Sequence, residues 1–450
     1  MTMLYKGPTT RLFSAQALLF CACLLMLLFL YGYGDNGEPN PLEDQGVSRW
    51  AVTKIWSSSK GGADDKMARQ NTSRSSEEAQ GTPSGFNMTR ELIRLNPGIF
   101  SALPREFLPN YKNPCWFEKV NETDVGSQLR DRLVDNGTGH FRLRCLPYFY
   151  IIGMPKCGTT DLYYRITEHP DVVGGPKEPH WWAKNRRHLL EKYLDYFDEA
   201  AWTIRTRVRK SLTSSGQEVL NHDVITGDGS PSTIWCNNRW REQQWDTPNN
   251  EPPILVADLL RAVQPHAKFI LTLRNPTERL YSEYLFFSGG FRDKKSVTDF
   301  HERATLAIDI FQSCLKNNTV RSCTYDPNLP PTRTVRLRLG LYEVYLRDWL
   351  SVFPRDQILV QRLEDHSKDP HTTMTRVFKF LDLGPITNQS DKDAIFMSNA
   401  KRSQKKRYDS IGQMLPKTRR MLNKFYRPYN QRLAELLNDT DYLWLKKSSV

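Results

Sequence analysis

A short segment at residues 153–160, Gly-Met-Pro-Lys-Cys-Gly-Thr-Thr, has the composition of an anion-binding loop. Two glycines permit a tight turn, a lysine supplies charge, and two threonines supply hydroxyl donors. If a helix begins at the threonines, its first N–H groups and its dipole favour a bound phosphate. We therefore predict a phosphate-binding loop made by Lys156, Cys157, Gly158, Thr159 and Thr160.

This loop differs from the P-loop of nucleotide kinases and NTPases, which reads G-x-x-x-x-G-K-[ST]. Thr159 follows the second glycine, and the lysine lies inside the loop at position 156. The Gly-Lys-Thr signature is therefore absent, which disfavours a metal-dependent NTPase or a nucleotide kinase. A strand–turn–helix without a ligand is the remaining alternative.

A second cluster follows another apolar segment. Arg274 ends that segment, and Ser282 comes eight residues later on an expected helix. A guanidinium and a hydroxyl placed in this way could hold a second phosphate. The pattern is weak by itself, because Arg279 with Glu278 or Glu283 could be an ordinary surface pair on the same helix.

A third cluster, at residues 177–182, reads Lys-Glu-Pro-His-Trp-Trp. Group transfer to a hydroxyl requires a base that accepts its proton, and a partly desolvated carboxylate suits this role. Glu178 is the candidate base, and His180 is the candidate group that orients it. Trp181 and Trp182 fit either stacking on sugar rings or a buried aromatic pair, and the sequence leaves both alternatives open.

Alternating strands and helices are expected to position these residues. Residues 148–152, 268–273 and 357–360 are short apolar runs typical of buried strands. Helices are expected at 160–169, 276–284 and 342–353. This order predicts an α/β fold with a mostly parallel, doubly wound sheet, in which ligands bind at the carboxyl ends of the strands.

The N-terminal part of the chain predicts a membrane anchor. Residues 13–33 contain no charged side chain and are long enough to span a bilayer as one helix. Basic residues precede them and acidic residues follow, so residues 1–12 are expected to be cytosolic and the remainder lumenal. A cleaved signal peptide is the alternative. Residues 34–91 have the polar composition of a flexible stem, and residues 92–450 that of a lumenal globular domain.

Cysteines and glycosylation sequons agree with a lumenal location. Cys314–Cys323 is the favoured disulfide and Cys115–Cys145 a weaker candidate, whereas Cys157 lies inside the predicted phosphate-binding loop and Cys236 has no evident partner. No CxxC spacing is present, so no metal site is predicted. Seven Asn-x-Ser/Thr sequons follow the anchor, at Asn71, Asn87, Asn121, Asn136, Asn317, Asn388 and Asn438. The net charge of +13 favours an acidic partner, although a solvated basic surface would give the same value.

Together, the three clusters resemble those of the Golgi carbohydrate sulfotransferases. The resemblance covers most of residues 96–450 and is closest to the N-acetylgalactosamine 4-sulfate 6-O-sulfotransferase branch, which forms the E unit of chondroitin sulfate. The segments that carry it are 141–147, 150–161, 177–182, 274–284, 339–342, 362–366 and 425–428. It implies a P-loop-like sulfotransferase fold and a Golgi membrane protein of single-pass type II topology.

The resemblance also implies the donor, 3′-phosphoadenosine 5′-phosphosulfate, and the roles of the candidate residues. By position, residues 156–160 would hold the 5′-phosphosulfate, and Arg274 and Ser282 the 3′-phosphate. Glu178 would be the general base, with Lys156 neutralising the leaving oxygen without a metal ion. The expected acceptor is an acidic glycosaminoglycan rather than a nucleic acid, and a homodimer is left open.

Two other interpretations stay open. One is a sulfotransferase that acts on another glycan such as heparan sulfate. Related heparan enzymes carry an Asp five residues after the glutamate, where this chain has Ala183, which weakens that assignment. The other is a catalytically inactive glycan-binding relative, against which the intact Lys156, Glu178, Arg274 and Ser282 argue.

Overall fold

The computed structural model describes residues 88–445, except 122, 124–125, 187, 239, 241–246, 288–294, 330–333 and 398–410. The expected cytosolic tail, the anchor and almost all of the stem lie outside the described residues, as do the sequons at Asn71 and Asn87. Among the helices that are described, none combines the length and the apolar character needed to cross a bilayer.

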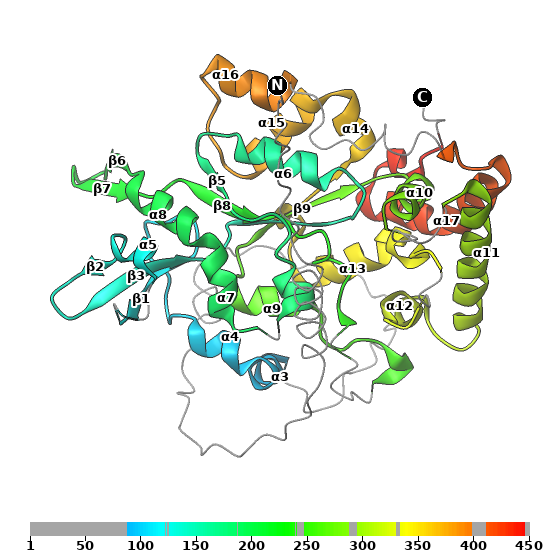
Figure 1. Cartoon of the computed structure of the whole chain (residues 1–450), viewed down its shortest axis with the longest axis horizontal. Helices are drawn as coiled ribbons and strands as arrows, with labels where there is room; N and C mark the ends of the chain where they lie inside the picture. The colour runs from blue at the N-terminus through cyan, green and yellow to red at the C-terminus, as the bar shows by residue number, and fades with distance from the viewer. Residues whose placement is uncertain are drawn as a thin grey trace, which may run out of the picture. The chain divides into compact units, whose positions relative to one another are not determined.

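A five-stranded parallel sheet forms the centre of the described region (Figure 1). Its order is β10 (Ile358–Arg362), β9 (Lys268–Leu273), β4 (Phe149–Gly153), β8 (Ile225–Asp228) and β5 (Val172–Gly174), and every neighbouring pair is parallel. The three strands expected from apolar runs are confirmed. Strands β5 and β8 were not predicted, because both are short and β8 contains Thr, Gly and Asp with only one apolar residue.

Helices cover both faces of this sheet, as expected for a doubly wound fold (Figure 1). Phe149 and Ile151 of β4 pack in one cluster with α6 (Thr159–Thr167) and α15 (Pro370–Phe380). The alternate residues, Tyr150 and Ile152, pack on the other face with α9 (Val256–Val263) and α13 (Tyr342–Val352). Successive side chains of a strand point to opposite faces, so a strand that is apolar throughout must be covered twice.

Three further helices pack together on one side of the sheet (Figure 1). They are α10 (Pro276–Phe287), α11 (Val297–Cys314) and α17 (Pro416–Leu437). The helices expected from the sequence correspond to α6, α10 and α13, with ends that differ by at most three residues.

An antiparallel sheet that the sequence reasoning did not predict lies beside α8 (Asp198–Thr206). Its order is β1 (Cys115–Val120), β3 (His140–Cys145) and β2 (Val134–Asp135). The buried guanidinium of Arg144 joins it to the main body, with contacts of 2.9 Å to Glu118, 2.9 Å to Asp195 and 2.7 Å to Asp198. Such a buried charge is tolerated only because each side of the guanidinium meets a carboxylate.

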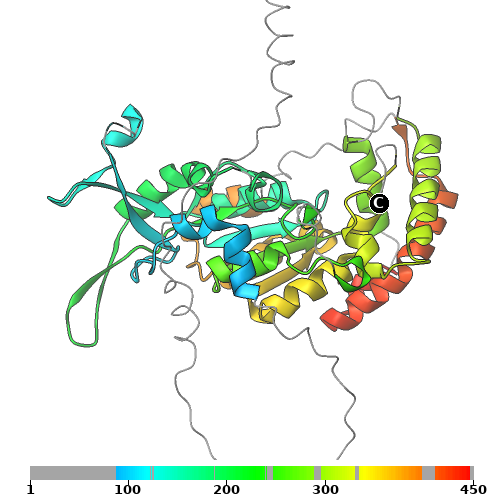
Figure 2. The same cartoon turned by 90° about the horizontal axis from the view of Figure 1, so that it is seen from below.

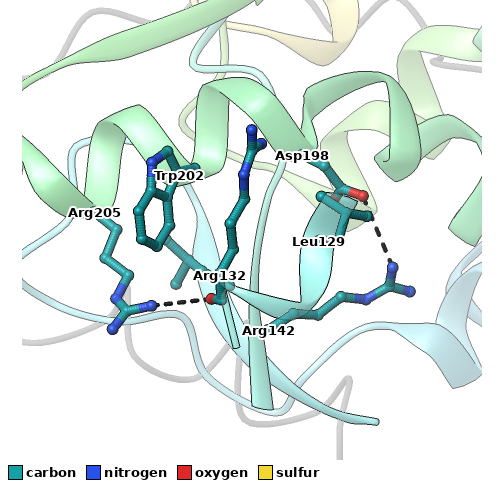
Figure 3. Close-up of a pocket in the computed structure, with 7 residues that line it drawn as sticks. Leu129, Arg132, Arg142, Asp198, Trp202 and Arg205 are labelled. Atoms are coloured by element: carbon teal, nitrogen blue, oxygen red, sulfur yellow. Dashed lines mark hydrogen bonds and ion pairs between the residues drawn. The ribbon is translucent and has the colours of Figure 1, made fainter. Parts of the chain in front are cut away.

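A shallow hollow lies next to this clamp (Figure 3). Its lining residues are Leu129, Arg132, Arg142, Leu143, Asp198, Trp202 and Arg205. Both arginines already have partners, because Arg205 donates to the Arg132 carbonyl at 3.1 Å and the Arg132 side chain forms an ion pair with Glu199. None of the candidate site residues lines this hollow.

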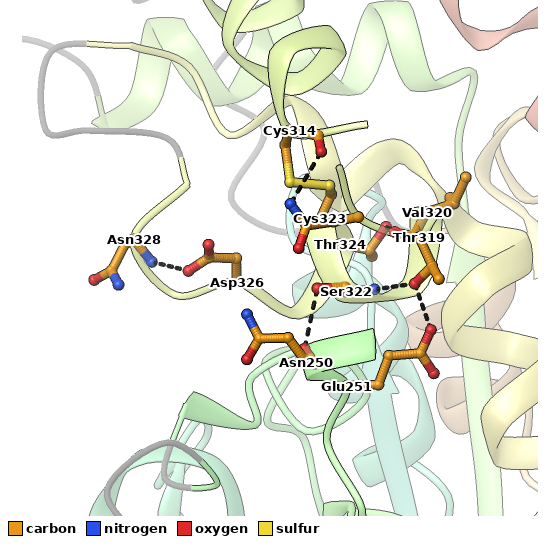
Figure 4. Close-up of a disulfide and its surroundings, with 11 residues drawn as sticks. Asn250, Glu251, Cys314, Thr319, Val320, Ser322, Cys323, Thr324, Asp326 and Asn328 are labelled. Atoms are coloured by element: carbon orange, nitrogen blue, oxygen red, sulfur yellow. Dashed lines mark hydrogen bonds between the residues drawn. A yellow bond between two sulfur atoms is a disulfide. The ribbon is translucent and has the colours of Figure 1, made fainter. Parts of the chain in front are cut away.

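Two disulfides are present among the described residues. Cys314–Cys323, the favoured pair, is confirmed and joins the end of α11 to α12 (Val320–Tyr325) (Figure 4). The weaker candidate, Cys115–Cys145, is also confirmed and links directly paired positions of β1 and β3. Cys157 and Cys236 are free and buried.

The cysteines give a direct test of this fold. In the native protein, burial should protect the thiols of Cys157 and Cys236 from iodoacetamide. Unfolding in guanidinium without reductant should expose both, while the four paired cysteines stay unlabelled. Peptide mapping by mass spectrometry distinguishes these states, and labelling of Cys115 or Cys145 before reduction would contradict the arrangement.

Candidate functional site

The phosphate-binding loop lies between β4 and α6, at the carboxyl end of the central strand. Gly158 adopts φ +79 as the residue before α6, and a Cβ there would lie 2.6 Å from Leu363. Glycine is therefore required for both conformation and space. The N–H groups of Thr159 and Thr160 begin the helix and have no acceptor within it, so they can bind an anion.

Cys157 faces away from this opening. Its thiol is fully buried, burial raises its pKa to about 12, and its N–H donates to the Met154 carbonyl at 3.2 Å. Its thiol is therefore a packing group under the loop rather than a contact for a ligand. The sequence pattern could not separate it from its neighbours, because side-chain direction within a loop is a tertiary property.

Lys156 and Arg274 meet at the mouth of the loop. Arg274, at the end of β9, donates to the Lys156 carbonyl at 3.4 Å, and the Lys156 ammonium lies 3.7 Å from the centre of the Phe286 ring. Burial, followed by the charge of Arg274, lowers the pKa of Lys156 to about 8. Among the residues that the structure describes, neither cation forms an ion pair with a carboxylate, and a nearby anion would relieve their repulsion.

Ser282 lies on the same face of α10 as Phe286, because the two are four residues apart on one helix. Phe286 contacts Lys156, so this face is directed toward the loop. The hydroxyl of Ser282 is half-buried and has no hydrogen bond to a described residue. Ser282 therefore lies on the side of α10 that faces Lys156, whose carbonyl Arg274 contacts, and the joint role of Ser282 and Arg274 stays a prediction.

The expected pair of Arg279 with Glu283 is present, but it is buried rather than on the surface. The Arg279 side chain is fully buried and forms an ion pair with Glu283, which also pairs with Arg336. Glu278 instead pairs with Arg419 of α17. Arg279 is thus an internal support of α10, since a buried arginine is stable only with partners around it.

Glu178 lies in the loop that precedes a short helical turn at Trp181–Asn185. Its carboxylate forms an ion pair with Lys177 and lies 3.5 Å from Nε2 of His180. The Glu178 side chain remains 38% exposed, so an incoming hydroxyl can reach it. Glu178 and His180 both have positive φ, so the loop presents their side chains through a tight backbone turn.

Hydrogen bonds from the segment after β8 fix His180. Nδ1 lies 2.7 Å from the Ser232 hydroxyl, and the backbone N–H donates to the Ser230 hydroxyl at 2.9 Å. Burial, followed by the charge of Lys184, lowers the pKa of His180 to about 4. The imidazole is therefore neutral near pH 7 and can position Glu178 without adding charge.

Sequence reasoning missed the buried carboxylate of Asp228, which supports this segment. Tyr193 donates to it at 2.8 Å, and burial raises its pKa. The turn-forming residues Asp-Gly-Ser-Pro-Ser at 228–232, where the very short strand β8 ends, could have indicated a loop at the carboxyl end of a strand.

Trp181 and Trp182 belong to the core. Their side chains are 2% and 1% exposed, and both rings contact Tyr193, with centroids 5.0 and 5.8 Å away. The interpretation that they stack on sugar rings is therefore wrong, and the buried aromatic pair is confirmed. Both belong to the largest hydrophobic cluster of the described region.

The phosphate-binding loop and the Glu178 loop meet through β8, the neighbour of β4 in the sheet. The segment that holds His180 continues to Ile234, whose N–H donates to Ile152 at 3.0 Å. A Cβ on Gly153 would lie 2.6 Å from the same isoleucine, so the two strand exits are in close contact. The structure thus brings the three predicted clusters to one edge of the sheet.

The geometry fits a nucleotide that carries two anionic groups. One group would be held by Lys156 and the start of α6, and the other by Arg274 and Ser282. Within the described part of the chain, no group of His, Cys, Asp and Glu side chains is arranged to hold a metal ion.

The chain is similar to several known proteins. A family model described as a sulfotransferase domain matches residues 146–427. Carbohydrate sulfotransferase 15 from Homo sapiens is 41% identical over 384 residues, covering 77% of this chain and 67% of its own. The mouse bifunctional heparan sulfate N-deacetylase/N-sulfotransferase 4 is 25% identical and is covered over only 34% of its length. A solved sulfotransferase from Alicyclobacillus acidocaldarius is 20% identical with a TM-score of 0.43, covering 65% of this chain and 96% of that one.

Lys156 should make nucleotide binding dependent on pH. Its pKa of about 8 means that it is charged below that pH and loses its charge as the pH rises. The affinity for adenosine 3′,5′-bisphosphate should then fall by up to about tenfold per pH unit above 8, because one proton is linked to binding. Calorimetric titrations between pH 6.5 and 9.5 measure this slope.

The matched variant is Lys156→Arg, whose guanidinium stays charged over this range. Its affinity should be nearly independent of pH, even if its absolute value is lower. The phosphates of the nucleotide titrate near pH 6 and do not account for a change above pH 8. A flat profile in the unsubstituted protein would show that Lys156 does not contact the anion.

Proposed function

The chain belongs to the sulfotransferase family, and from this premise we propose that it transfers a sulfuryl group from 3′-phosphoadenosine 5′-phosphosulfate to a glycosaminoglycan. The proposed acceptor is the 6-hydroxyl of 4-sulfated N-acetylgalactosamine in chondroitin or dermatan sulfate. The observation that carries the proposal is the pair of cations, Lys156 and Arg274, without carboxylate partners among the described residues and next to the start of α6. The 41% identity to carbohydrate sulfotransferase 15 supports the acceptor class.

The proposed reaction is a direct displacement at sulfur. The acceptor oxygen forms a bond to sulfur while the bond from sulfur to the bridging phosphate oxygen breaks. Glu178 accepts the hydroxyl proton, and adenosine 3′,5′-bisphosphate leaves with the electron pair. Charge on the departing oxygen increases along this path, so the Lys156 ammonium stabilises the transition state more than the ground state.

His180 and Lys177 position the base in this scheme. The neutral imidazole is held by Ser232 and borders one oxygen of Glu178, while the ammonium of Lys177 holds the other. The carboxylate therefore has a fixed direction but remains accessible. Pre-orientation of a base lowers the barrier because less ordering is needed during the reaction.

We also propose that this domain lies in the Golgi lumen, anchored by residues 13–33. The two disulfides support an oxidising compartment. The five sequon asparagines within the described residues, Asn121, Asn136, Asn317, Asn388 and Asn438, are all exposed and therefore accessible to glycosylation.

The test is transfer of radiolabelled sulfate by the full-length chain, purified in detergent, to a panel of acceptors. We expect transfer to chondroitin 4-sulfate and dermatan sulfate, and little to heparan sulfate or desulfated chondroitin. Preferential labelling of heparan sulfate would replace the proposed acceptor. Absence of transfer to every acidic glycan by folded, nucleotide-binding protein would refute the enzymatic function.

Substitution of the base separates catalysis from binding. Glu178→Gln should reduce kcat by about 10²–10⁴-fold, because the amide cannot accept the proton. The affinity for adenosine 3′,5′-bisphosphate should stay within about twofold, since that ligand is held mainly by charge and by the helix terminus. The matched control is Glu302→Gln, an exposed glutamate of α11 outside the site, which should leave both quantities unchanged. Loss of nucleotide binding in Glu178→Gln would instead assign Glu178 a structural role.

A further inference from the structure

The helix α17 carries a strong excess of positive charge. It contains six basic residues, and Glu435 is its only acidic residue. The basic residues are Lys417, Arg419, Arg420, Lys424, Arg427 and Arg432. Surface helices normally mix both signs, because opposite charges three or four residues apart stabilise a helix.

Four of these cations form a row on the solvent side, which we call the basic row: Lys417, Arg420, Lys424 and Arg427. All four are exposed, and their spacing of three, four and three residues places them on one face of the helix. The opposite face is buried in the core, through Thr418, Leu422, Tyr426, Tyr429 and Leu433. The basic row therefore points directly away from the body of the protein.

The other two cations are used within the fold. Arg419 forms an ion pair with Glu278 of α10, and Arg432 lies 3.2 Å from Glu343 of α13. In contrast, no member of the basic row forms an ion pair with a residue that the structure describes. The row is thus not explained by packing of α17 on its neighbours.

The basic row is unfavourable for the isolated helix. Each neighbouring pair places like charges three or four residues apart, which destabilises a helix. Lys417 also lies in the first turn, where the positive end of the helix dipole disfavours a cation, and that turn holds no acidic residue. Repulsion between like charges that no acidic residue of the helix offsets is expected where a surface binds a ligand of opposite charge.

The shape of the row matches an extended ligand. The rise of 1.5 Å per residue gives it a length of about 15 Å, and the row ends before Pro428, which interrupts the hydrogen bonding of the helix. A small anion is bound by donors that converge on one point, whereas these side chains lie along a line. A chain with repeated negative charges can contact all four at once.

The contacts of α17 connect this surface to the donor site. Thr277 donates to Asn423 at 2.7 Å, and Tyr281 donates to the Gly412 carbonyl just before α17, also at 2.7 Å. Thr277 and Tyr281 lie on α10, the helix that carries Ser282. Figure 2 shows α17, in red, along the outer edge of the described region. A polymer held on α17 is therefore held on an element fixed to the catalytic body.

Among polyanions, a glycan fits better than a membrane surface. A membrane-binding amphipathic helix inserts an apolar face between the lipids. The apolar face of α17 is already buried in the core, and its exposed positions are almost all charged or polar. The proposed lumenal location also argues against nucleic acid.

We propose that the basic row is an accessory site that binds the sulfated glycosaminoglycan chain at a distance from the reacting sugar. This inference rests on the proposed function and extends it. The site would raise the affinity for long acceptors through charge, without contact with the sugar that receives the sulfate. Short acceptors cannot reach from the site of sulfate transfer to the basic row, so the row would not raise their affinity.

The test compares a polymer with a short acceptor. In the variant with Lys417, Arg420, Lys424 and Arg427 all replaced by Gln, the KM for polymeric chondroitin 4-sulfate should rise by about tenfold, from four exposed charge contacts. The dependence of this KM on salt should become weaker. Turnover of a chondroitin 4-sulfate tetrasaccharide and the KM for the donor should change less than about twofold.

The matched control removes the same charge from other surfaces. Lys316, Lys368, Arg376 and Lys379 are exposed and lie outside α17 and the donor site, so their joint replacement by Gln should leave the polymer KM nearly unchanged. Two half variants, Lys417→Gln with Arg420→Gln and Lys424→Gln with Arg427→Gln, should each give about a threefold rise in that KM. They keep the test valid if the fourfold variant does not fold.

The outcomes separate the two proposals. If the unsubstituted protein sulfates no acidic glycan, the proposed function fails. If it sulfates the polymer but the fourfold variant behaves like the control, the accessory site is refuted. A variant that keeps its polymer KM but loses binding to vesicles with 30% phosphatidylserine would assign the row to a membrane and also overturn the inference.

Discussion

The site depends on two positive charges that are held close together and form no ion pair with a carboxylate among the described residues. Lys156 and Arg274 come from the ends of adjacent strands, β4 and β9, and burial, followed by the charge of Arg274, lowers the pKa of the lysine. The fold must hold them there against their repulsion. It does so through backbone contacts, because Tyr342 donates to the Arg274 carbonyl at 2.8 Å and Glu364 accepts from the next N–H at 2.8 Å.

Neutral hydrogen bonds from hydroxyl groups, rather than charges, fix the loop that carries Glu178 and His180. Ser230 and Ser232 hold His180 by neutral hydrogen bonds, and burial keeps the imidazole uncharged. A protonated histidine beside Glu178 would add a third cation to a site in which Lys156 and Arg274 already supply two for the nucleotide donor. The local polar groups therefore fix geometry, while charge is reserved for Lys177, Lys156 and Arg274.

Arginine has three distinct roles in this protein, and partners decide which one applies. Arg144 and Arg279 are buried among carboxylates and act as structural clamps. Arg274 is half-buried, forms no ion pair with a described carboxylate and faces the donor site. Arg420 and Arg427 are exposed on the outer face of α17 without a carboxylate partner among the described residues, which is the basis for assigning them an external ligand. Composition alone, a net charge of +13, cannot separate these groups.

The sequence by itself determined the elements that are dictated by local patterns. Apolar runs marked β4, β9 and β10, and the Gly158-Thr159-Thr160 series marked the start of α6, because burial on both faces and helix initiation leave strong local signals. Only the tertiary structure decided features that depend on contacts between distant segments. These include strand β8 with Asp228 and the serines behind His180, the burial of Trp181, and the inward direction of Cys157. Short strands and side-chain directions carry little local signal, since they are fixed by neighbours far away in the chain.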